Sequence, residues 1–126
     1  MLLLLAQLCI LVVLAVLNIW FGIVKDLYNI IWWWDIPTHF LGGVWAGVFT
    51  AWYLQHARRD VSILYCALGA LSVGLIWEVF EAHFSVGTDP FMPYWLDTCK
   101  DLLMDTVGGS TAGLAIRLQR QLWLRK

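Results

Sequence analysis

Three short segments of the sequence place acidic and imidazole side chains together in otherwise apolar surroundings. They are residues 35–39 (DIPTH), 77–83 (WEVFEAH) and 97–105 (DTCKDLLMD). Carboxylates that come together repel one another, so they stay ionised only where a cation or a basic group neutralises them. Carboxylates with one imidazole suit Zn²⁺, Mn²⁺, Fe²⁺ or Mg²⁺, and helix bundles build such sites from inward-facing side chains. A divalent cation held there could also turn a bound water into a nucleophile.

Helical spacing puts the polar side chains of each segment on one face. Intervals of three or four residues within a helix bring side chains to the same side. The sets that obey this spacing are Asp35 with His39, Glu78 with Glu81, and Asp97 with Asp101 and Asp105. Small residues continue each face, namely Gly42 and Ala46, Gly74, and Gly108 and Ala112. We therefore expect three helices to turn these faces toward a common interior.

Five of these side chains are predicted to bind the cation, and a sixth to act as a general base. The predicted ligands are Asp35, His39, Glu78, Asp101 and Asp105, and the predicted base is Glu81. A metal-dependent hydrolase or transferase acting on a lipid headgroup or another cell-envelope substrate fits this set. His83 lies two positions from Glu81 and falls off the shared face.

Two non-enzymatic functions compete with this hypothesis. One is a binding or transport module that captures a cation or a proton. The other is a structural subunit whose carboxylates pair with Lys or Arg of a partner chain. Few polar residues continue from the acidic segments toward the opposite end of the spans, which disfavours a conduction path through a monomer. A path through an oligomer stays open.

Simpler structural roles also exist for single residues. Asp35 precedes Ile36 and Pro37 and is typical of a helix N-cap, and Asp97 could cap a helix in the same way. His39 could be a hydrogen-bonded interior histidine, and Glu81 could lie in the headgroup region. These roles fit Glu78, Asp101 and Asp105 less well, because an ionisable group within a span costs at least about 2.5–3.5 kcal/mol.

The composition places these segments in a membrane. Of the 126 residues, 61% are hydrophobic and 13% are charged, against about 45–50% and 25% in soluble domains. This excludes a soluble globular domain, a disordered tail and a nucleic-acid-binding protein. Four stretches approach the length of about 20 residues that a span needs. They cover residues 1–24, 36–54, 61–84 and 97–118 and predict an all-α, four-transmembrane-helix bundle, a single integral membrane domain over residues 1–126.

The basic residues predict the orientation of this bundle. Arg58 and Arg59 occupy the second connection, and the C-terminal tail carries Arg117, Arg120, Arg125 and Lys126. Under the positive-inside rule both segments are cytoplasmic, and an even number of spans then places both termini inside. The three polar segments consequently lie at the outer end of a multi-pass protein of the cell inner (plasma) membrane.

The same segments carry a family resemblance. Residues 35–43 match the pattern D-x-x-x-H-F-x-x-G, residues 77–81 an aromatic-E-x-x-E, and residues 97–108 a D-T-x-x-D followed by Gly after six residues. In this order, over residues 28–115, they resemble the YjdF-like prokaryotic inner-membrane proteins and, more distantly, the VanZ-like proteins. The resemblance implies a polytopic helical membrane protein and supplies no reaction. Members of that family carry additional spans before the first motif, so a homo-oligomer or a membrane partner stays open.

Overall fold

The computed structural model describes residues 1–84 and 90–124, and within them the chain folds into helices joined by short connections. The helices are α1 (Leu2–Ala15), which continues as the π-helix η1 (Val16–Val24), α2 (Leu27–Ile30), α3 (Asp35–His56), α4 (Ile63–Phe84) and α5 (Tyr94–Leu124). No strand occurs within these two ranges. The predicted all-α class is confirmed. Arg125 and Lys126, which entered the orientation argument, lie outside the described residues.

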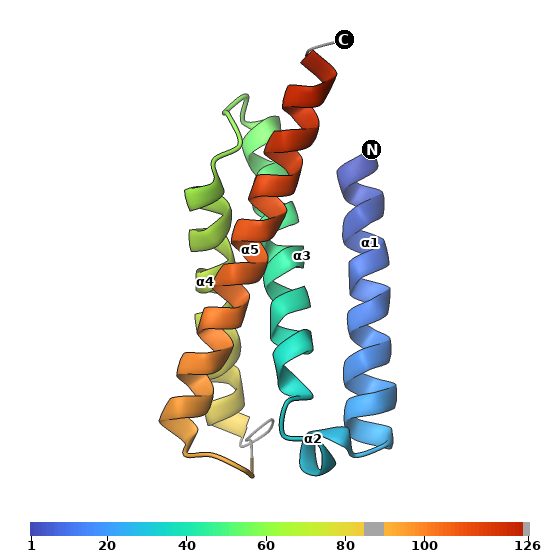
Figure 1. Cartoon of the computed structure of the whole chain (residues 1–126), viewed down its shortest axis with the longest axis vertical. Helices are drawn as coiled ribbons and strands as arrows, with labels where there is room; N and C mark the ends of the chain where they lie inside the picture. Colours follow the sequence, from blue (N-terminus) through green and yellow to red (C-terminus); the bar gives the residue numbers. More distant parts are fainter. Residues whose placement is uncertain (85–89, 125–126) are drawn as a thin grey trace.

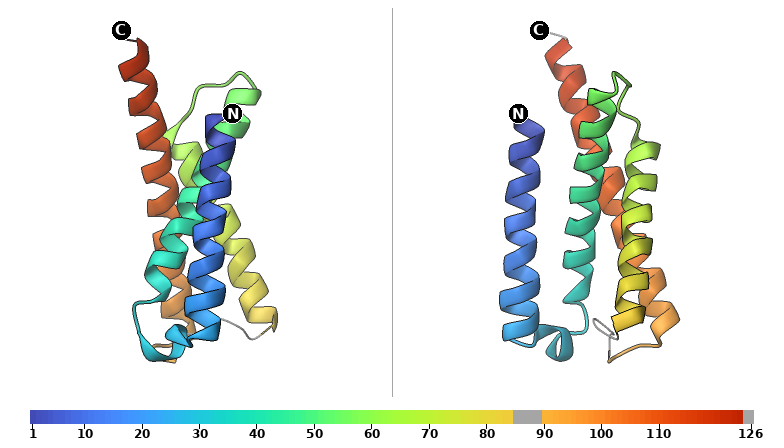
Figure 2. Two further views of the ribbon diagram at one scale, coloured as in Figure 1. Left: turned by 90° about the vertical axis from the view of Figure 1, so that its right-hand side faces the viewer. Right: turned by 180° about the vertical axis from the view of Figure 1, so that it is seen from behind.

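Three long helices form the centre of the bundle. α3 packs against both α4 and α5, and α1 lies along α3 (Figures 1 and 2). The start of α1, the end of α5 and the connection from α3 to α4 lie at one end of the bundle, which is the upper end in Figure 1. The short helix α2 and the start of α5 lie at the opposite end. The start of α3, the end of α4 and the start of α5 therefore share the same lower end.

Small residues let the central helices approach closely. A Cβ added to Gly43 of α3 would collide with the backbone of Asp105 in α5, and one added to Gly108 would collide with the carbonyl oxygen of Phe40. Gly109 makes an equally close contact with Ala70 of α4. Close backbone approach is a main source of helix association in lipid, where helices gain little from hydrophobic burial. Of the predicted small-residue faces, Gly74 and Gly108 therefore lie at close helix–helix contacts.

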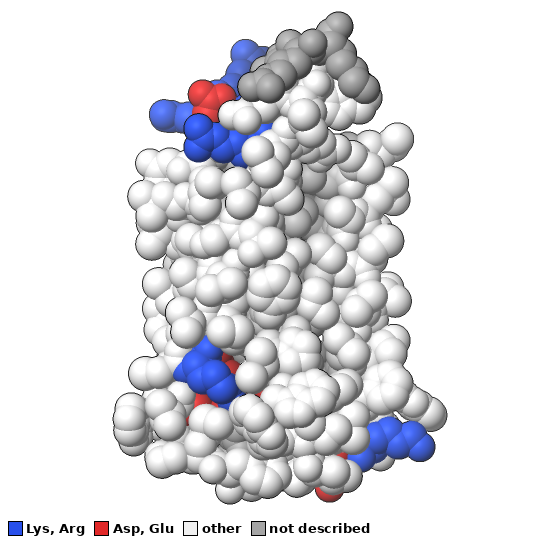
Figure 3. All heavy atoms as spheres, in the orientation of Figure 1, with Lys and Arg blue, Asp and Glu red and all other residues white. Residues whose placement is uncertain are grey.

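Polar side chains are buried in this bundle while large apolar ones point outward. Within α4, Ile76 and Val79 are 71% and 70% exposed, whereas Glu78 and Glu81 are only 5% and 8% exposed. A soluble protein would show the reverse distribution. Figure 3 shows charged side chains near the two ends of the face that it draws, with an uncharged band between them. This distribution suits a protein whose flanks contact lipid.

Two helices are long and apolar enough by themselves to cross a membrane. They are Leu2–Val24, formed by α1 and η1, and Ile63–Phe84, which is α4. α3 and α5 have 22 and 31 residues, and a span needs about 20. Both interrupt their apolar runs with ionisable residues near their first turns.

The connection between the first two long helices is held by a tyrosine. The Tyr28 hydroxyl donates a hydrogen bond to Oδ1 of Asn18 in η1, and the Tyr28 ring covers Gly22, where a Cβ would collide with it. Burial raises the pKa of the Tyr28 phenol to about 12. A phenol is protonated at neutral pH even at its ordinary pKa of about 10, so the hydroxyl is a donor there and its hydrogen bond holds α2 against the end of η1.

Candidate metal centre

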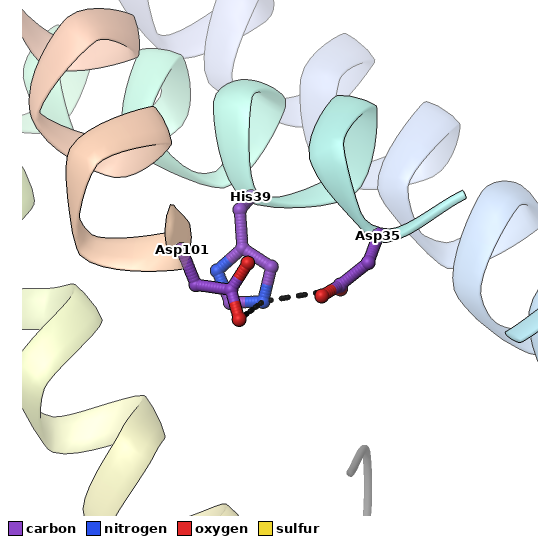
Figure 4. A group of neighbouring side chains, drawn as sticks. All are labelled: Asp35, His39 and Asp101. Carbon is purple, nitrogen blue, oxygen red and sulfur yellow. Dashed lines mark ion pairs between the residues drawn. The ribbon is translucent and has the colours of Figure 1, made fainter. Parts of the chain in front are cut away.

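His39 lies among three carboxylates from two helices. Its Nε2 atom is 3.3 Å from Oδ1 of Asp35 and 3.9 Å from Oδ2 of Asp101, and its Nδ1 atom is 3.4 Å from Oδ2 of Asp105. Figure 4 shows Asp35 and His39 from α3 and Asp101 from α5 pointing toward one another. The i, i+4 spacing brings Asp35 to His39, whereas the close packing of α3 on α5 brings the other two.

Two groups of side chains have the compactness that a metal ion needs. Asp35, His39 and Asp101 each offer a ligand atom, and these atoms all lie within 4.8 Å of one another. His39, Glu78 and Glu81 meet the same criterion. His39 belongs to both groups, so α4 contributes its two glutamates beside the α3–α5 contact. All six residues predicted for the site are 1% to 9% exposed.

Uncharged donors hold the two glutamates of α4. The Thr98 hydroxyl donates to Oε2 of Glu78 over 2.6 Å, and the Trp77 indole N–H donates to Oε1 of Glu81 over 2.8 Å. The other carboxylate oxygen of Glu78, Oε1, is buried and has no hydrogen-bond partner in the part of the chain that the structure describes. Buried acceptors without a partner are rare in proteins and call for an explanation.

Lys100 enters the cluster on its α3–α5 side. Its Nζ atom is 2.7 Å from Oδ1 of Asp97, 3.2 Å from Oδ2 of Asp35 and 3.5 Å from Oδ1 of Asp101. The last contact is an ion pair but not a hydrogen bond, and Oδ1 of Asp101 has no hydrogen-bond partner among the described residues. Sequence reasoning assigned Lys100 no role in the site. Its position three residues after Asp97 and directly before Asp101 was the available signal.

We call the resulting arrangement the acidic layer. It consists of the carboxylates of Asp35, Glu78, Glu81, Asp97, Asp101 and Asp105, together with His39 and Lys100. If all six carboxylates are ionised, one lysine and one histidine leave an excess of at least four negative charges. Burying unpaired charges is strongly unfavourable, so the layer must take up protons, a cation or the basic groups of a partner.

Two of the simpler roles considered for the acidic residues are wrong. α3 begins at Asp35 itself, Trp34 occupies the N-cap position, and no side chain caps this helix end. The Asp35 carboxylate contacts His39 and Lys100 instead. Asp97 follows the first residue of α5, Tyr94, by three positions, so it lies inside the first turn and not at the cap. His83 is exposed and packs edge-on against Phe84.

A helical bundle with apolar flanks and a buried acidic and histidine layer defines a membrane protein with a polar interior. The chain belongs to the family described as Predicted membrane protein (DUF2238), which it matches over residues 2–121. The resemblance to the YjdF-like membrane proteins is thereby confirmed. The chain matches no curated protein and no solved structure.

Proposed function

We propose that this membrane protein binds a divalent cation in the acidic layer, with Asp35, His39 and Asp101 as ligands. The observation that supports this most directly is the spacing around Nε2 of His39. Oxygen and nitrogen ligands lie about 2.0–2.2 Å from zinc, so neighbouring ligand atoms are about 3–4 Å apart. The two distances from Nε2, 3.3 Å to Asp35 and 3.9 Å to Asp101, fall in this range. Zn²⁺, Mn²⁺, Fe²⁺ and Mg²⁺ are the candidates.

The sequence predicts that Asp105 is a metal ligand, but in this proposal Asp105 orients His39 instead. It lies on Nδ1, the ring nitrogen that does not face Asp35 and Asp101. Histidines that bind a metal through one nitrogen commonly donate the other N–H to a carboxylate, which fixes the tautomer and the ring orientation. Asp105 would thus hold His39 with Nε2 directed at the cation.

Element analysis of the detergent-purified protein tests the cation. We expect wild-type protein to retain at least one equivalent of a divalent metal per chain. Asp105→Asn should weaken the affinity by about 10–100-fold, because it alters the group that orients His39. Asp60→Asn is the matched control, since Asp60 is exposed and pairs with Arg120 at the other end of the bundle. Wild-type protein that binds no metal even after reloading would instead favour a network of protonated carboxylates or docking of a basic partner chain.

We further propose four membrane spans with both termini in the cytoplasm and the acidic layer at the outer end of the plasma membrane. The supporting observation is the separation of charge. The basic residues Arg58, Arg59, Arg117 and Arg120 belong to the α3–α4 connection and the end of α5, which lie at the end of the bundle opposite the acidic layer (Figure 1). This is the asymmetry that the positive-inside rule describes.

Reporter fusions test this topology. Fusions after Arg59 and after Lys126 should report a cytoplasmic location, and a fusion near Asp89 should report an outside location. The physical reason is the retention of arginine-rich connections on the cytoplasmic side. An outside signal after Lys126 would contradict the count of four spans and would move the acidic layer relative to the membrane.

A second candidate function is hydrolysis or group transfer at the outer membrane surface. A bound cation lowers the pKa of its water and can supply a nucleophile. Glu81 supports this candidate, because a carboxylate oxygen of Glu81 lies within 4.8 Å of a His39 nitrogen. With a single cation on His39, Glu81 would accept the proton of the bound water. Lipid headgroups are the substrates that such a position would reach.

A further inference from the structure

We infer that the acidic layer holds two divalent cations, the second one bound by Glu78 and Glu81 beside His39. This inference rests on the proposed function and deepens it, because it assigns the stoichiometry of the same layer. The second cation would be coordinated by the two glutamates, and water would complete its shell, as is common for hard cations held by one or two carboxylates. Glu81 would then be a ligand and would no longer be free to act as a base.

The first argument is the unpartnered oxygen of Glu78. Glu78 is 5% exposed, and its Oε1 atom is buried without a hydrogen bond in the described ranges. A carboxylate oxygen of Glu78 lies within 4.8 Å of one from Glu81 and of a His39 nitrogen. A cation between the two glutamates would satisfy the oxygen that the protein itself leaves without a partner.

The second argument is how each glutamate is held. Thr98 and Trp77 each donate to one oxygen of Glu78 and Glu81, respectively. The Thr98 hydroxyl and the Trp77 indole carry no charge, so they orient the carboxylates without neutralising them. Carboxylates that bind metals are typically fixed by such hydrogen bonds from outside the coordination shell. On the Asp35–Asp101 side, by contrast, the ammonium group of Lys100 already supplies positive charge.

The third argument is the charge of the whole layer. With neutral His39 bound to a cation, six ionised carboxylates and Lys100 leave an excess of five negative charges. One divalent cation reduces this excess to three, and a second reduces it to one. Because His39 belongs to both groups, the two cations would be close neighbours. Paired cations about 3.5–4 Å apart are an established arrangement for clamping the attacking and leaving oxygens of a displacement.

Titration of the metal-free full-length protein with Mn²⁺ in detergent tests this inference. We expect two Mn²⁺ per chain and an electron paramagnetic resonance spectrum of a coupled pair. One Mn²⁺ per chain with the spectrum of an isolated ion would overturn the two-cation inference and leave the proposed function standing. Binding of neither Mn²⁺ nor Zn²⁺, titrated in its place, would overturn both.

Variants locate the second cation. Glu78→Gln combined with Glu81→Gln should bind one Mn²⁺ with the spectrum of an isolated ion, whereas Asp60→Asn should still bind two. If the double variant fails to fold, Thr98→Val and Trp77→Phe keep the test open, because they leave both glutamates in place. Each should weaken the second binding step by about 10–100-fold and leave the first unchanged. Two unchanged binding steps in these variants would overturn the assignment to Glu78 and Glu81.

Discussion

Removing divalent cations should lower the thermal midpoint of the wild-type protein in detergent, and Asp101→Asn should abolish the part of that effect that comes from the cation bound by Asp35, His39 and Asp101. A cation that binds only the folded state stabilises it by about 2.7 kcal/mol at a concentration one hundred times its Kd. For a chain of this size that corresponds to a shift of roughly 10 °C. Asp101 is 1% exposed and faces both His39 and Lys100. A neutral amide at this position is a poor ligand for a hard cation.

The measurement compares the midpoints of each protein with chelator and after divalent ions are added back. Trp33→Phe serves as the control, because Trp33 is 46% exposed and takes no part in the acidic layer. This variant should keep the full wild-type response. If neither chelator nor added metal changes the thermal midpoint at neutral pH, the cation proposal is wrong. A network of protonated carboxylates or a docking surface for a basic partner would then explain the layer.

Whereas Asp101→Asn should reduce the dependence of stability on divalent cations, Lys100→Met should increase it. The Lys100 ammonium contacts Asp35, Asp97 and Asp101, and its side chain is only 15% exposed. Removing one partner of a buried ion pair costs about 3–5 kcal/mol, because the remaining charges lose their compensation. We expect the metal-free variant to be destabilised by about this amount, and added divalent cations to restore more of its stability than in wild type.

The measurement is denaturation of the variant in matched buffers with and without divalent ions. Lys25→Met is the control, because Lys25 is exposed. Its Nζ atom lies 5.6 Å from the centre of the Trp20 ring. Changes at such surface positions usually stay within about 0.5 kcal/mol. If metal-free Lys100→Met matched wild type in stability, the acidic layer would have to be largely protonated. The layer would then not carry the excess of negative charge that calls for cations.

Much of the local structure could be read from the chain. The apolar runs at 36–54 and 61–84 predicted helices there, and the helices cover Asp35–His56 and Ile63–Phe84. This agreement follows from physics that acts over a few residues, because a helix satisfies its own backbone hydrogen bonds within an apolar stretch. The π-helical end of the first helix and the short α2 were not predicted. Tyr28 of α2 contacts Asn18 of η1 across ten positions, and the spacing of apolar residues does not reveal such a contact.

The polar faces were equally accessible from spacing. Intervals of three and four residues predicted which carboxylates share a side of each helix, and all six predicted site residues are buried. The caps expected for Asp35 and Asp97 were wrong. Asp35 instead meets Lys100 of α5, a tertiary partner that a local signal cannot register. Asp97 lies inside the first turn of α5 and pairs with the same lysine three residues along that helix.

The sequence by itself determined that this chain is a helical membrane protein whose acidic and histidine side chains lie on the same faces as its small residues. Only the tertiary structure decided which of them meet. The close contacts of Gly43 with Asp105 and of Gly108 with Phe40 set how far α5 approaches α3 and at which height. That approach places Asp101 and Asp105 on opposite nitrogens of His39 and brings Lys100 to Asp35. Helical periodicity selects a face, but the depth and distance of neighbouring helices depend on packing between residues far apart in the chain.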